Sequence, residues 1–186
     1  EGYVKYVPPQ EDVAAVLLAA SPWEQDFLNM ILKTGARLGE VMKLKWEDVN
    51  FERGYITLWT RKRKGGQMEP RSAPMLSGTK LFEIMKRRWE RRGEDHVYVF
   101  TNPLTGDRYM KNQHSICLML KRLCARARVK AFGFHALRHY VSWRLMDSGK
   151  CTVADIQHLL GHQRTTTTDT YLKSFMPNMD KLGAVL

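Results

Sequence analysis

The chain has 186 residues, a length that suits one domain and is enough to bury a core without disulfides or metal ions. Its 30 Lys and Arg residues outnumber its 19 Asp and Glu residues, and the net charge of +11 at pH 7 favours nucleic acid over an anionic membrane as partner. No apolar run approaches the roughly 18 residues of a membrane span, and three cysteines without a CxxC pair argue against a disulfide framework or a cysteine-based zinc site.

The N-terminal part of the chain is predicted to be a linker followed by helices. Residues 1–12 are interpreted as a linker from a preceding domain, because two adjacent prolines interrupt them before a helical apolar pattern begins at Val13. A second helix is predicted from Pro22 to about Lys33, with a serine N-cap before it and a Thr-Gly stop after it. A short helix is expected within residues 36–44.

A basic β-hairpin is predicted next. Residues 55–60 are rich in β-branched and aromatic side chains and form its first strand, and residues 69–74 return as the second. Between them the sequence RKRKGG sets four consecutive cations ahead of a Gly-Gly pair, which predicts a flexible finger that contacts DNA. The side chains expected to bind DNA are Arg61, Arg63, Lys64 and Arg71.

The second half of the chain is predicted to be helical apart from one short strand. Apolar residues recur at helical spacing in four segments, and residues 97–100 have the composition of a strand. The predicted helices span residues 76–92, 112–128, 134–148 and 152–160, and Gly161 ends the last of them. This order predicts a mainly α fold with a small antiparallel β-sheet, an α+β architecture.

Four side chains in the C-terminal third are suited to handling a phosphate. His135 and Arg138 lie three residues apart on one predicted helix, so they can reach one anion together. His162 follows the helix stop, and Tyr171 lies in a threonine-rich segment that we expect to move, as a nucleophile delivered on demand would. Cations around a tyrosine, without a cluster of carboxylates, indicate phosphoryl transfer through a covalent tyrosine ester.

A metal site is the rival chemical interpretation of the same stretch. His135 and His139 have the i,i+4 spacing that zinc-binding helices use. No Glu follows the first histidine as in HExxH, and no carboxylate lies close by in the sequence. We therefore expect no metal ion and no cofactor.

An earlier arginine is a candidate for the same anion. Arg37 stands where the chain turns from one predicted helix into the next, a position at which a solvated surface arginine would also be ordinary. Glu40 lies one turn further on, so it can hold the guanidinium through an i,i+3 contact.

Four short segments carry a family resemblance. TGARLGE, HALRH, LLGH and TTTDTY occur in this order, and they resemble the motifs of the tyrosine recombinases, the family of phage and transposon integrases. The resemblance implies a tyrosine-recombinase catalytic domain over residues 13–175 and a C-terminal tail over residues 176–186. It also implies a separate N-terminal core-binding domain, and a tail that packs on a neighbouring protomer, with a frayed terminus as the alternative.

The resemblance assigns roles to individual positions. It implies that the catalytic residues are Arg37, His135, Arg138, His162 and Tyr171, with the tyrosine as nucleophile, together with one lysine of the hairpin. Counting from the strand start favours Lys62, and Lys64 remains open because the tip here is longer than the compact turn common in the family. Glu40 and His139 are expected to support these residues.

A site-specific DNA recombinase or integrase is the function that the resemblance implies. Such an enzyme cleaves DNA through a 3′-phosphotyrosyl intermediate and a free 5′-hydroxyl, then exchanges and rejoins strands without metal or ATP. The implied partners are double-stranded DNA at a specific recombination site and further copies of the chain, a homotetramer on DNA. We expect a bacterial or phage-encoded protein of the cytoplasm, associated with the nucleoid, that integrates or excises a prophage or another mobile element.

Two other functions remain as alternatives. The first is a DNA-binding module without catalysis, which acts as a repressor or an accessory protein. The second is a type IB topoisomerase, which shares the tyrosine chemistry and would relax supercoiled plasmid without site preference.

Overall fold

The computed structural model describes residues 6–61, 66–107 and 114–161. Within these ranges the elements are α1 Gln10–Ala19, α2 Pro22–Thr34, α3 Leu38–Val41, the 3-10 helix η1 Trp46–Asp48, β1 Val49–Asn50, β2 Tyr55–Arg61, β3 Met68–Pro74, α4 Lys80–Glu90, α5 His114–Arg126, α6 Phe134–Asp147 and α7 Val153–Leu160. The mainly α fold with a small antiparallel sheet is confirmed. None of the described helices is long and apolar enough to cross a membrane.

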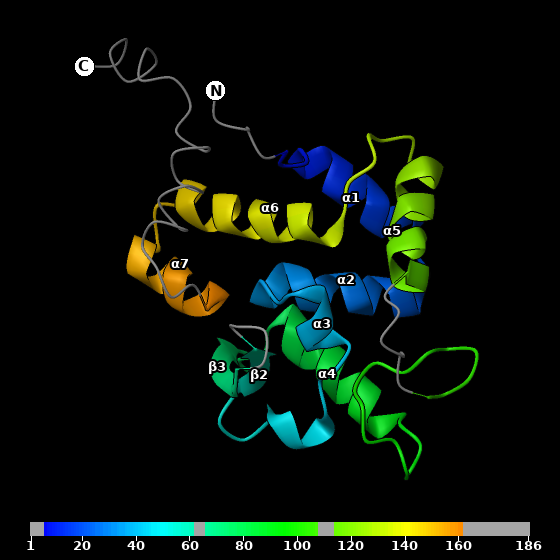
Figure 1. Ribbon diagram of the computed structural model, residues 1–186, viewed down its shortest axis with the longest axis vertical. Helices are drawn as coiled ribbons and strands as arrows, with labels where there is room; N and C mark the ends of the chain where they lie inside the picture. Colours follow the sequence, from blue (N-terminus) through cyan, green and yellow to red (C-terminus); the bar gives the residue numbers. More distant parts are fainter. Residues whose placement is uncertain (1–5, 62–65, 108–113, 162–186) are drawn as a thin grey trace.

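Helix α2 is the central element of the fold. It lies between α6 on one side and α3 and α4 on the other (Figure 1). Its first turn is closed by Glu24, whose carboxylate accepts the backbone N–H of Ser21 at 2.7 Å. Phe27, Met30 and Ile31 are fully buried, so this helix supplies much of the core. Gly35 caps its C-terminal end with a φ of 61°, a left-handed conformation that glycine adopts without strain.

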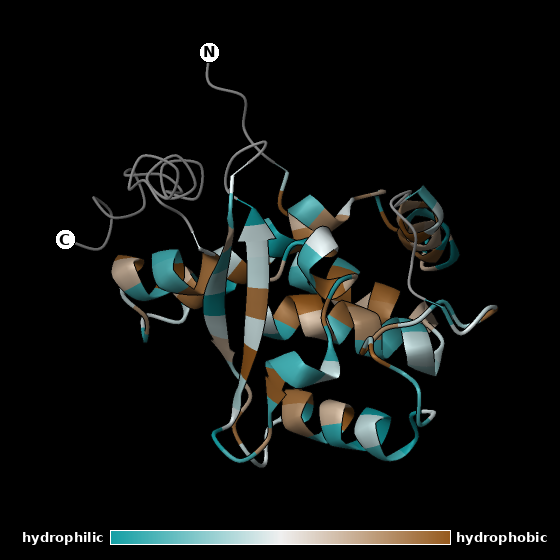
Figure 2. Cartoon of the chain, turned by 60° about the horizontal axis from the view of Figure 1, so that its bottom comes forward, coloured by the Kyte–Doolittle hydropathy of each residue, from teal (hydrophilic) through white to brown (hydrophobic). Residues whose placement is uncertain are grey.

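The sheet is antiparallel and has the order β1-β2-β3. Strands β2 and β3 form a long ribbon beside the apolar helices (Figure 2), paired from Tyr55 with Pro74 to Arg61 with Met68. Side chains alternate along it, and the inward face of β2 carries Ile56, which is fully buried. The predicted hairpin is confirmed, and its ribbon leads toward the basic tip.

Helix α7 contacts both helix α6 and the sheet. It packs against α6 and against β3 (Figure 1). Thr152 caps it by accepting the backbone N–H of Asp155 at 3.2 Å, and Gly161 ends it with a φ of 62°. The predicted start and stop of this helix are both confirmed, and its C-terminal end is held against the rest of the domain.

Three predictions differ from the structure. The linker predicted over residues 1–12 is shorter, because Gln10, Glu11 and Asp12 already form the first turn of α1. The helix predicted over residues 76–92 begins only at Lys80, because the Thr79 hydroxyl caps it by accepting the backbone N–H of Phe82. The strand predicted over residues 97–100 is wrong, because this segment makes one isolated bridge, between Tyr98 and Lys45. The carbonyl of Val99 accepts a hydrogen bond from the guanidinium of Arg88 in α4, and not from the backbone of a neighbouring strand.

Candidate active site

Arg138 is held at the centre of the candidate site. This α6 side chain is 1% exposed, and its guanidinium donates to two backbone carbonyls, those of Gly35 and Leu160. The first carbonyl follows the C-terminal end of α2 and the second is the last residue of α7. A guanidinium carries five N–H donors in a planar fork, a geometry that suits binding to the oxygens of an anion.

Arg37 reaches the same region from the turn after α2. It has extended backbone angles directly before α3, and its side chain is 38% exposed. Its backbone N–H donates to Oε2 of Glu40 at 2.8 Å, and Nη1 lies 3.1 Å from Oε1 of the same carboxylate. Nη1 also donates to the Thr60 hydroxyl on β2 at 3.3 Å. The i,i+3 contact expected for this pair is present, and it fixes the guanidinium between α3 and the hairpin.

Glu40 connects two arginines through one buried carboxylate. Besides Arg37 it accepts Nη2 of Arg71 at 2.6 Å, and its own side chain is 3% exposed. Burial acts to raise the pKa of the Glu40 carboxyl, but the charge and hydrogen bond of Arg71, followed by the contacts of Arg37, outweigh it. The pKa therefore lies below its ordinary value, and the carboxylate is charged at neutral pH.

Arg71 occupies a different place from the one expected of a DNA-contacting side chain. It was predicted to bind DNA, yet it is buried, with one terminal nitrogen on Glu40 and the other donating to the carbonyl of Leu159. Its place on β3 explains this burial: buried and exposed residues alternate along the strand, and Arg71 shares the inward face with the buried Ala73. That alternation is a signal in the sequence that could have indicated its burial.

The two histidines of α6 differ in their surroundings. His135 is exposed, whereas His139 is buried at 3% exposure. Their rings pack edge to face, with centroids 4.6 Å apart and an interplanar angle of 82°. Arg138 follows His135 by three residues on the same helix, so both side chains belong to adjoining turns.

Five predicted site residues lie outside the described residues. They are Lys62, Arg63, Lys64, His162 and Tyr171. The chain leads toward them from two described positions: the exposed Arg61 at the end of β2, and Gly161 at the end of α7. The structure therefore brings together Arg37, Glu40 and Arg138 of the predicted site.

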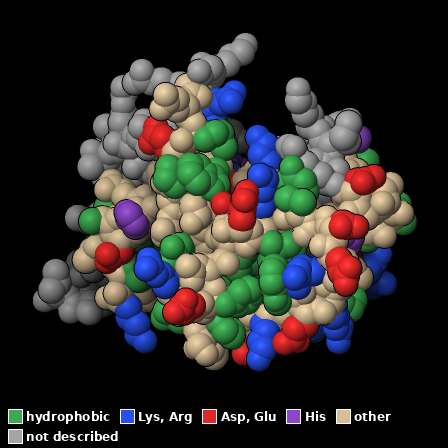
Figure 3. All heavy atoms as spheres, turned by 90° about the horizontal axis from the view of Figure 1, so that it is seen from below, with side chains coloured by type: hydrophobic (Ala, Val, Ile, Leu, Met, Phe, Trp, Pro, Cys, Tyr) green, Lys and Arg blue, Asp and Glu red, His purple; other side chains and the backbone are tan. Residues whose placement is uncertain are grey.

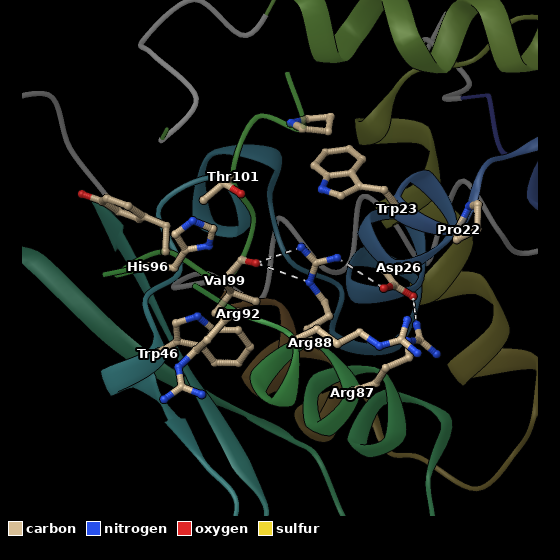
Figure 4. A pocket seen from close by; sticks show the side chains of 13 residues that line it. Pro22, Trp23, Asp26, Trp46, Arg87, Arg88, Arg92, His96, Val99 and Thr101 are labelled. Carbon is tan, nitrogen blue, oxygen red and sulfur yellow. Dashed lines mark hydrogen bonds and ion pairs between the residues drawn. The ribbon is translucent and has the colours of Figure 1, made fainter. Parts of the chain in front are cut away.

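A pocket of about 310 Å³ lies at the other end of α2. Trp23 and Asp26 of α2 line it with Arg87, Arg88 and further side chains (Figure 4). Arg88 lies 3.3 Å from the Asp26 carboxylate and donates to a backbone carbonyl at 3.0 Å, so its guanidinium is engaged in structural contacts. Seen from below, the domain mixes acidic and basic side chains around apolar patches (Figure 3). The positive charge is therefore not collected on that face.

Comparison with known proteins decides the family. The sequence pattern of the phage integrase family matches residues 10–177. The chain belongs to the phage integrase family. This membership confirms the resemblance to tyrosine recombinases that the four sequence motifs carried.

Individual recombinases and integrases are similar to this chain in sequence or in fold. Tyrosine recombinase XerA of Pyrococcus furiosus is 31% identical over 144 residues, which are 77% of this chain and 48% of that protein. The crystal structure of XerA recombinase superposes with a TM-score of 0.75 at 22% identity, over 100% of this chain and 65% of that chain. A lambda integrase tetramer bound to a Holliday junction gives a TM-score of 0.73 at 19% identity, over 97% and 51% of the two chains. The chain spans 40% to 59% of the length of the curated relatives that it matches.

The lowered pKa of Glu40 predicts how stability depends on pH. The folded pKa lies below the unfolded one, so the stabilisation by Glu40 is complete above the unfolded value and is lost as pH falls through the folded value. At neutral pH, Glu40→Gln should lower the free energy of unfolding by about 3 kcal/mol, because it leaves buried Arg71 without its counter-charge. Below the ordinary carboxyl pKa of 4.5 this difference from the wild type should shrink.

Urea unfolding of both proteins between about pH 3 and about pH 7 measures this difference. Glu52→Gln, at an exposed position in the turn before β2, is the matched control and should stay near zero throughout. A wild-type advantage over Glu40→Gln that stays constant across the range would contradict the ion-pair explanation.

Proposed function

We propose that this chain contains the strand-cleaving centre of a site-specific DNA recombinase. The observation that carries the proposal is the convergence of two arginines from distant parts of the chain. Arg138 of α6 donates to the carbonyl of Gly35, and Arg37 follows that glycine by two residues, so both arginines lie at the turn that ends α2. Membership of the phage integrase family supports a shared DNA phosphate as their target.

Two arginines suit a phosphodiester because its two non-bridging oxygens repel an incoming oxyanion. A planar guanidinium can bind both oxygens in a bidentate fork, and it keeps its charge at every physiological pH. The benefit grows as charge develops on these oxygens in the transition state. Arg37 and Arg138 therefore stabilise the reaction electrostatically, and their positions are set before DNA arrives by Glu40, Gly35 and Leu160.

Tyr171 is the proposed nucleophile. A tyrosine hydroxyl in water has a pKa of about 10, so attack by such a group at neutral pH needs a proton acceptor and a positive field. His135, exposed on α6 one turn before Arg138, is the proposed acceptor. His162 is proposed to donate a hydrogen bond to the phosphate. The bond from tyrosine oxygen to phosphorus forms as the bond from phosphorus to the 5′-oxygen breaks.

A lysine of the hairpin tip is the proposed general acid. It donates its proton to the departing 5′-oxygen, which leaves as a hydroxyl. Lys62 is the first candidate and Lys64 the second, both within the tip that follows Arg61. Arg61 and Arg63 contribute positive charge that attracts the DNA backbone. The 5′-hydroxyl of another strand then attacks the phosphotyrosine and rejoins the DNA.

The proposed partners are a specific duplex site and further copies of the chain. A lambda integrase with the same fold is a tetramer bound to a Holliday junction, which supports this assembly. Residues 1–9, which precede α1, are proposed to link the catalytic domain to an N-terminal core-binding domain, and residues 176–186 to contact a neighbouring protomer. We propose that the enzyme acts in the bacterial cytoplasm, where it integrates or excises a prophage or mobile element.

Tyr171→Phe should abolish covalent attachment to DNA and leave DNA affinity nearly unchanged, because only the nucleophilic oxygen is removed. The wild-type chain is incubated with a pool of nicked duplexes of randomised sequence, and complexes that survive denaturing detergent are recovered and sequenced. The wild type should yield adducts enriched in one site, and the variant none. Adducts formed by Tyr171→Phe would reject the assignment of the nucleophile.

The same selection separates the alternative functions. A binding module without catalysis would give no wild-type adduct. A topoisomerase would give adducts without sequence enrichment and would relax supercoiled plasmid.

The hairpin acid should be revealed by a leaving group that needs no proton. A 5′-bridging phosphorothiolate releases a thiolate, which is a far weaker base than an alkoxide. Lys62→Ala should lower the cleavage rate on the selected oxygen substrate by about 100-fold or more, and the sulfur substrate should restore it. The comparison of both rates for Lys62→Ala and Lys64→Ala measures this. Rescue of Lys64→Ala alone would move the role to Lys64.

A further inference from the structure

Arg71 joins three parts of the candidate site that come from different elements. From β3, its Nη2 lies 2.6 Å from the Glu40 carboxylate of α3, and its Nη1 donates to the carbonyl of Leu159 in α7. Its side chain is 5% exposed. A Cβ added at Gly161 would lie 2.8 Å from Cδ of Arg71, so the backbone at the end of α7 packs directly on the stem of this side chain.

These contacts continue into both arginines of the proposed phosphate site. Glu40, bound by Arg71, also holds the backbone and the guanidinium of Arg37. Leu160, next to the carbonyl that Arg71 binds, accepts from Arg138. Arg138 in turn contacts the carbonyl of Gly35, two residues before Arg37. The contacts therefore form a closed ring through α3, β3, α7 and α6.

We propose that Arg71 is a positioning residue of the recombinase reaction, an inference that rests on the proposed function. It orients Arg37 through Glu40 and fixes the end of α7 against Arg138. It does not contact the DNA phosphate, because its guanidinium is buried and paired with a carboxylate.

The fork of an arginine is what this position requires. The two acceptors, the Glu40 carboxylate and the Leu159 carbonyl, belong to different elements and bind different terminal nitrogens. A lysine has one nitrogen on a flexible stem and cannot reproduce the rigid, planar fork. Arg71→Lys should therefore keep the charge but loosen the ring at one of its two contacts.

The test compares cleavage with DNA binding in the whole 186-residue chain. The substrate is a nicked duplex of the sequence recovered with the wild-type chain. For Arg71→Lys, the adduct rate at saturating DNA should fall by about 10-fold or more, since small misplacements of catalytic groups have effects of this size. The salt dependence of binding should stay as in the wild type. Arg53→Lys, at an exposed turn position, is the matched control and should leave both unchanged.

Two outcomes would overturn the proposal. A wild-type adduct rate in Arg71→Lys would show that the fork is not needed. A salt-dependence slope lowered by about 0.9 in Arg71→Gln, which removes the charge, would show that Arg71 neutralises a DNA phosphate itself. Absence of any adduct with the wild-type chain would instead reject the proposed function, so the two failures are distinguishable.

A second pair of variants tests the same contact without changing a charge. Gly161→Ala forces a Cβ against Arg71, whereas Gly78→Ala, also at positive φ, meets nothing within 4 Å. Both variants share the backbone strain of a left-handed position. If Arg71 sets the site, the adduct rate should fall by about 10-fold more in Gly161→Ala than in Gly78→Ala. Equal rates for the two folded variants, judged by thermal unfolding, would contradict the proposal.

Discussion

The arrangement of the site depends on one buried carboxylate between two arginines. Glu40 contacts Arg37 at 3.1 Å and Arg71 at 2.6 Å, and removing Glu40 would leave the buried Arg71 without a counter-charge. A buried charge of this kind is costly to desolvate, so it contributes more to specific positions than to net stability. Arg71 is buried, whereas Arg37 is partly exposed. The Glu40 carboxylate therefore connects a fixed side chain of the interior to an arginine that a ligand can reach.

Helix ends, rather than helix faces, form the rest of the site. Gly35 ends α2 and Gly161 follows α7, and each adopts a positive φ that lets the chain turn closely past a neighbour. A Cβ at Gly35 would lie 2.7 Å from the side chain of Leu160, so the two turns are in direct contact. Free carbonyls at such ends accept the guanidinium of Arg138. The glycines are therefore needed both for the turns and for the approach of α7.

Local signals in the sequence predicted most of the fold and part of the site. The caps and stops of α2 and α7 depend on residues within one turn, so their bounds agree with the structure. The prediction of a strand at residues 97–100 was wrong because the hydrogen bonds of this segment depend on groups distant in the sequence, among them the Arg88 guanidinium. The burial of Arg71 was not predicted for a related reason: a basic hairpin suggests DNA contact, and only the tertiary structure brings the Glu40 carboxylate to this side chain.

The central claim is that Arg37 and Arg138 act on the charge of one phosphate. Its most direct test replaces the scissile phosphodiester of the selected site by a neutral methylphosphonate, which lacks the charge that the arginines neutralise. On the phosphodiester, Arg37→Ala and Arg138→Ala should each lower the rate of adduct formation by about 100-fold or more. On the methylphosphonate, both defects should become much smaller. Defects of equal size on the two substrates would contradict the account.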